Sequence, residues 1–104
     1  MTREALLERV KRTVREIEAD AEIILYGSRS RGDAREYSDW DFLILVDGPV
    51  DMKRTDAIRH RLYDVELDSG EVLCSIVRSR EDWSGPLLRI TPFHQNVQRE
   101  GIVL

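Results

Sequence analysis

Residues 26–46, YGSRSRGDAREYSDWDFLILV, span the boundary between two strands and thereby decide the fold. The apolar residues 23–26 predict a short β-strand, which Gly27 ends. Residues 40–46 predict a second strand that is apolar on both faces after Asp41, as is typical of a strand in the centre of a sheet. A Gly-Ser turn and a pair of aspartates are therefore expected at the ends of two neighbouring strands.

The elements outside this stretch are predicted from periodicity and from capping residues. They are a helix over residues 3–19, a helix over residues 51–67, a strand over residues 72–77 and a helix from Thr91-Pro92 to Gly101. In a competing interpretation, residues 63–68 form a strand that pairs with residues 72–77 through a Ser-Gly turn. The order of the elements predicts a small α+β, α/β-like domain over residues 1–104, with one sheet of at least three strands.

The composition limits the classes of protein to which the chain can belong. Its 104 residues suffice for one compact domain, and its net charge of −4 makes nucleic acid an unexpected partner. No apolar run approaches the ~20 residues needed to cross a bilayer, and the amphipathic start is unlike a signal peptide, so a cytoplasmic protein is expected. Cys74, the one cysteine, lies in the apolar run VLCSIV, where a buried, inert thiol is expected.

Asp39 and Asp41 form a pair whose spacing has a chemical consequence. Residues two apart in a strand point to the same face, so these carboxylates project together while Trp40 points to the opposite face. Two adjacent carboxylates repel each other, and a bound divalent cation reverses that balance. Mg²⁺ held by one or two carboxylates usually completes its octahedron with water and substrate phosphates. The pair therefore predicts a magnesium site of the kind that binds a nucleoside triphosphate.

The Gly27-Ser28 turn supplies the complementary half of such a site. Glycine has no Cβ, so a phosphate can approach the backbone closely at this point. The Ser28 hydroxyl can donate a hydrogen bond, and the guanidinium group of Arg29 or Arg31 can donate bidentate, charge-assisted hydrogen bonds. The sequence thus predicts that phosphates lie against Gly27-Ser28, with Mg²⁺ joining them to the aspartates. A plain turn beside a solvated, salt-bridged loop is the structural alternative.

The motif Gly27-Ser28, ten intervening residues, then Asp39-Trp40-Asp41 and Phe-Leu-Ile-Leu-Val resembles the signature of the DNA polymerase β-type nucleotidyltransferase superfamily. Within it, the chain is most similar to the minimal nucleotidyltransferases of bacteria and archaea, and its tail SREDW…TPFHQNVQREGIVL resembles theirs. The resemblance implies a small mixed sheet with helices on one face and the nucleotide cleft on the other. It also implies that Gly27, Ser28 and Arg31 bind the nucleotide, and that Asp39 and Asp41 ligate Mg²⁺ and are catalytic.

The third acid of the family is the point at which this sequence departs from the resemblance. Full members carry another Asp or Glu on the next strand, whereas residues 72–77 contain none. Glu71, Glu66 and Asp68 remain open as candidates, as does the absence of any third acid.

Two functions follow from the resemblance. The first is Mg²⁺-dependent transfer of AMP from ATP to a hydroxyl acceptor on a partner protein, as in pairs of a HEPN toxin and a nucleotidyltransferase antitoxin. The alternative is a module of the same fold that binds a nucleotide or a partner protein, with turnover weak or lost.

Overall fold

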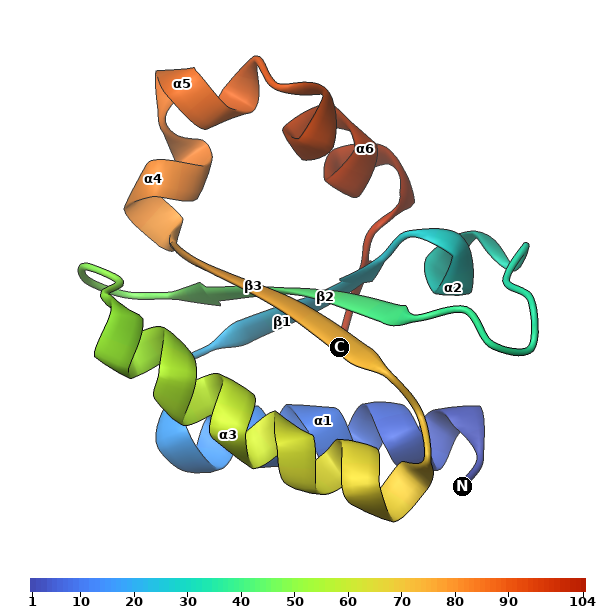
Figure 1. Ribbon diagram of the computed structural model, residues 1–104. Helices are drawn as coiled ribbons and strands as arrows, with labels where there is room; N and C mark the ends of the chain where they lie inside the picture. The colour runs from blue at the N-terminus through green and yellow to red at the C-terminus, as the bar shows by residue number, and fades with distance from the viewer.

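The computed structural model describes residues 1–104 and contains one four-stranded sheet with the order β3-β2-β1-β4 (Figure 1). The strands are β1 (Glu22–Tyr26), β2 (Trp40–Val46), β3 (Leu73–Ser79) and β4 (Ile102–Val103). β1 runs antiparallel to both β2 and β4, whereas β2 and β3 are parallel. The sheet is therefore mixed, as predicted, and the C-terminal tail adds its fourth strand.

Six helices complete the chain. They are α1 (Arg3–Ile17), α2 (Ser28–Arg31), α3 (Met52–Ser69), α4 (Arg80–Ser84), α5 (Pro86–Arg89) and α6 (Pro92–Glu100). Thr2, Asp51 and Thr91 cap the three longest of these, each accepting a hydrogen bond from a backbone N–H of the first turn.

The competing strand over residues 63–68 is wrong, because α3 continues through them. Ile58, Leu62 and Val65 are all buried, which requires helical rather than alternating geometry. Gly70 ends the helix with φ 74°, and its N–H donates to Glu66 O. The parallel pairing of β2 with β3 depends on this helix, since parallel strands need a crossover connection of such length.

The helices lie on both faces of the sheet (Figure 1). The two long helices, α1 and α3, pack against one face, whereas α4, α5 and α6 lie over the other. The expectation of helices on one face thus holds for the long helices only. The short helices follow β3 and close a second, smaller apolar cluster around Trp83 and Val97.

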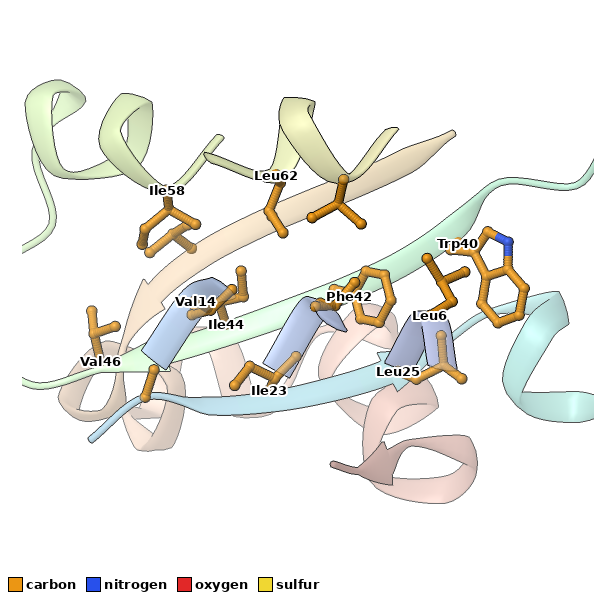
Figure 2. Close-up of a cluster of buried hydrophobic side chains, with 14 residues drawn as sticks. Leu6, Val14, Ile23, Leu25, Trp40, Phe42, Ile44, Val46, Ile58 and Leu62 are labelled. Atoms are coloured by element: carbon orange, nitrogen blue, oxygen red, sulfur yellow. The ribbon is translucent and has the colours of Figure 1, made fainter. Parts of the chain in front are cut away.

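The alternation of β2 decides which residues reach the candidate site. Trp40, Phe42 and Ile44 point into the main core with α1 and α3, and Figure 2 shows them converging with Leu6 and Leu62. The residues between them therefore point to the face of α4–α6. None of the helices combines the length and the apolar character needed to span a membrane.

Candidate functional site

Gly27 forms the turn between β1 and α2, and only glycine fits there. Its backbone has φ 78° and ψ −160°, a region that residues with a Cβ essentially never occupy. A Cβ placed on Gly27 would lie 2.5 Å from Oδ2 of Asp41. The structure thus brings the Gly-Ser turn and the second aspartate into direct proximity, as the sequence predicts.

The two aspartates reach this place through the pairing of β1 with β2. Asp41 lies opposite Tyr26 in the antiparallel register, and Asp39 comes just before β2 begins. Asp41 is half-buried and Asp39 is exposed. The pKa of Asp41 is raised, first by burial and then by the charge of Asp39, while Arg31 opposes the shift. The carboxylates therefore repel each other, which is the condition that a bound cation would relieve.

Cys74 is the residue of β3 that lies beside the aspartates, on the strand where the resemblance implies a third acid. It lies opposite Asp41 in the parallel register of β2 and β3, and its Sγ donates to Oδ2 of Asp39 over 3.5 Å. The prediction that this thiol is buried is wrong, because β3 is an edge strand and Cys74 is exposed. Partial desolvation and the hydrogen bond to Asp39 raise the pKa of the Cys74 thiol, so it is protonated at neutral pH.

The three candidate acids all have other partners. Glu71 accepts a hydrogen bond from Trp40 Nε1, 3.1 Å away, on the opposite side of the strand from the aspartates. Glu66 accepts the N–H of Leu73 over 3.0 Å, at the edge of the sheet. Asp68 forms an ion pair with Arg9 of α1. No group of three or more Asp, Glu, His or Cys side chains is arranged so that it could hold a metal ion.

The two candidate arginines have different surroundings. The Arg29 side chain is only 16% exposed, lies 4.4 Å from the centre of the Trp40 ring and donates to Ser38 O. Arg29 therefore stabilises the loop that precedes the aspartates. Arg31 is 46% exposed, and its charge acts on Asp41, so Arg31 is the arginine available at the site.

Glu100 is a site neighbour that sequence reasoning missed. Its Oε1 accepts the N–H of Gly27 over 3.2 Å, and its Oε2 lies 3.1 Å from Nη1 of Arg31. No local pattern links Glu100 to a turn 73 residues away; only the pairing of β4 with β1 does so.

Tyr26 also borders the site, and burial, followed by the charge of Asp41, raises its pKa to about 12. Tyr26 thus remains a neutral phenol beside the carboxylates over the whole physiological range.

The site is an open surface. None of the four cavities of the protein is lined by Gly27, Asp39 or Asp41. One of them, of about 340 Å³, lies between α3 and the edge of β3 and includes Cys74 in its lining. Ser28 adds a hydroxyl that makes no hydrogen bond within the protein.

Comparison with known proteins agrees with this arrangement of fold and site. Residues 7–93 match the nucleotidyltransferase domain family. A protein of Methanocaldococcus jannaschii named "putative protein adenylyltransferase" is 40% identical over 88 residues, which cover 79% of this chain and 75% of the relative. The chain therefore belongs to the nucleotidyltransferase family and is a nucleotidyltransferase, which confirms the resemblance to the minimal members.

A solved structure supports the same fold. A chain in the crystal structure of a toxin-antitoxin with AMP-PNP superimposes with a TM-score of 0.60 at 22% identity. The match covers 92% of the present chain and 69% of that chain. At this identity it shows the fold, which is the predicted mixed α+β arrangement.

Proposed function

We propose that the protein transfers AMP from ATP, together with Mg²⁺, to a hydroxyl group on a partner protein. The observation that carries the proposal is the contact between the Gly27 turn and Asp41, where no Cβ can be accommodated. Such a close approach joins a backbone turn suited to phosphate with a carboxylate pair suited to a cation. The name of the archaeal relative, a protein adenylyltransferase, supports AMP and a protein acceptor.

The residues at the site fit Mg²⁺ in a particular way. Asp39 and Asp41 offer hard oxygen ligands on one face, and the raised pKa of Asp41 means that two negative charges are held there at a cost. Two carboxylates are too few for a cage built by protein alone, but they suffice for an ion that also binds phosphate oxygens. Bound there, Mg²⁺ would neutralise phosphate charge and favour departure of the pyrophosphate.

The chain's own groups would position the nucleotide. The free hydroxyl of Ser28 would donate to a phosphate oxygen, and Arg31 would add its positive charge. The acceptor oxygen would form a bond with the α-phosphorus while the bond to the pyrophosphate breaks. The acceptor proton would pass to solvent, because the Cys74 thiol, which lies opposite Asp41, is itself protonated and cannot accept it. Catalysis would then rest on positioning and charge neutralisation.

A protein acceptor suits the open shape of the site. Water must be excluded for such electrostatic effects to reach full strength, and this chain provides no cavity around its aspartates. A second protein that brings the hydroxyl would cover the nucleotide at the same time. The toxin-antitoxin structure of the same fold and the resemblance to minimal nucleotidyltransferases support a HEPN-type toxin as this partner.

The experiment incubates the protein with ATP, Mg²⁺ and a HEPN-type protein, and follows the intact mass of both proteins. We expect the partner to gain the mass of AMP, and the double variant Asp39→Asn with Asp41→Asn to abolish the gain. Asp47→Asn is the matched control, because Asp47 follows the opposite end of β2 and its side chain is 72% exposed. No gain of mass with the unaltered protein would contradict transfer.

A non-catalytic binding module is the second candidate, and the thiol at position 74 favours it. In that case partner binding would survive the double asparagine variant, and no AMP would be transferred.

Nucleotide binding is tested separately with Ser28→Ala, which should weaken ATP binding and leave the melting temperature unchanged. A large fall in melting temperature would instead assign Ser28 to the structure of the turn. Mg²⁺ and ATP together should raise the melting temperature more than either alone.

A further inference from the structure

Glu100 makes the closest contacts with the phosphate-binding turn of any acidic residue outside β2. Its side chain is only 12% exposed. Oε1 accepts the N–H of Gly27 over 3.2 Å, and the two oxygens lie 3.3 and 3.1 Å from Nη1 of Arg31. A carboxylate buried to this degree requires such partners, because desolvation of an unpaired charge is expensive. Glu100 is thus tied to two of the residues assigned to the nucleotide.

The backbone fixes Glu100 in this place. Gly101 follows the last residue of α6, and a Cβ added there would lie 2.5 Å from Val97 O and 2.7 Å from Cγ2 of Ile24. The chain can therefore turn tightly onto β1, and Ile24 pairs with Val103 in the antiparallel register. Glu100, the last residue of α6, directly precedes this pairing and reaches the N–H of Gly27. The contact with Gly27 therefore depends on the pairing of β4 with β1.

We propose that Glu100 is a positioning residue, which holds the Gly27 turn and directs Arg31 toward the nucleotide phosphates; the inference rests on the proposed function. The N–H of Gly27 points to the β4 side, where Glu100 accepts it, whereas Asp41 belongs to β2 on the other side of β1. Glu100 therefore supports the turn from the edge of the sheet that lies away from the aspartates. Arg31 is held in the same way, between Glu100 and Asp33.

The test measures the dissociation constant of Mg²⁺-ATP by calorimetry, and KM and kcat for AMP transfer. Glu100→Ala should weaken ATP binding about tenfold, the loss expected for one charge-assisted hydrogen bond, and raise KM with little change in kcat. Glu100→Gln should lose less, because its amide oxygen still accepts the N–H of Gly27. Combined with Arg31→Ala, Glu100→Ala should cause little additional loss, since it acts partly through that arginine.

The matched control is Glu18→Gln at the far end of the fold. Glu18 is similarly buried, 18% exposed, and forms an ion pair with Arg54 at 2.7 Å. Its replacement should lower thermal stability and leave ATP affinity unchanged. If Glu100→Ala does not fold, the test uses Glu100→Gln. In this variant both the dissociation constant of Mg²⁺-ATP and the exchange rate of the Gly27 amide hydrogen should rise.

Three outcomes overturn the inference. Unchanged ATP affinity in folded Glu100 variants would show that the residue only stabilises the tail. Tighter binding would show that its carboxylate competes with phosphate for the turn. If the unaltered protein binds no Mg²⁺-ATP at all, the proposed function fails and the inference falls with it, which distinguishes this result from the other two.

Discussion

Gly27→Ala tests the geometry on which the site depends. The backbone at φ 78° and ψ −160° lies in a region that costs residues other than glycine about 1–3 kcal/mol. The new methyl group would also lie 2.5 Å from Oδ2 of Asp41, so the carboxylate must leave its rotamer, at about 0.5–1.5 kcal/mol. The two costs together are about 1.5–4.5 kcal/mol, which corresponds to a fall in melting temperature on the order of 15 °C for a domain of this size.

The assay compares thermal unfolding of Gly27→Ala with that of Gly70→Ala, followed by circular dichroism without nucleotide. Gly70 also has a positive φ, 74°, but a Cβ added there would meet nothing within 4 Å, so only the backbone cost of about 1–2 kcal/mol applies. In the double variant Gly27→Ala with Asp41→Ala, no carboxylate has to leave its rotamer. The double variant should therefore lose about 1 kcal/mol less stability than the sum of the two single variants. The contact between Gly27 and Asp41 would be refuted if Gly27→Ala and Gly70→Ala lowered the stability equally and the effects of Gly27→Ala and Asp41→Ala on stability were additive.

Three further predictions concern the carboxylates and the thiol. Without metal, Asp41→Asn should raise stability at neutral pH: the folded-state pKa of Asp41 lies above its usual 3.8, so stability falls as pH rises through that window. Urea titrations at pH 3.5 and 7 check this, and an equal effect at both values would count against it. Cys74→Asp should destabilise the metal-free protein by about 1 kcal/mol, which is the repulsion of two charges about 3.5 Å apart at a dielectric constant near that of water. Mg²⁺ should reverse this loss of stability and raise the rate of turnover. A loss of stability that Mg²⁺ leaves unchanged would refute the prediction. Glu71→Gln should leave AMP transfer unchanged, because Glu71 accepts the indole N–H of Trp40 instead of facing the aspartates; loss of transfer would make Glu71 the third acid.

The fold and most of the site could be predicted because their signals are local. Residues 23–26 and 40–46 are apolar runs of strand length joined by a loop, and adjacent strands in sequence usually pair. The helix over residues 51–67 carries Ile58 and Leu62 at a spacing of four, and both are buried as helical geometry requires. The side on which Asp39 and Asp41 project follows from the strand period alone.

The remaining features depend on tertiary structure that no local pattern encodes. Cys74 lies in an apolar run, but its exposure depends on β3 being the edge of the sheet, which is a property of strand order. Glu100 reaches Gly27 only because the last residues form β4 on the far side of β1. The division of the helices between two faces likewise depends on how α4–α6 pack on Leu43 and Leu45.

The number of carboxylates at the site has a consequence for the order of binding. A site with three acidic ligands can hold a cation by itself, whereas Asp39 and Asp41 with a neutral thiol beside them supply only two charges. An ion bound there must take its remaining ligands from water and from phosphate, so metal and nucleotide would each increase the affinity for the other. Glu100 would strengthen this coupling, because it contacts Arg31 without adding a charge to the face of the aspartates. With a neutral thiol at Cys74 and only two carboxylates, the proposed site would be completed by the arrival of the nucleotide, and not of the metal alone.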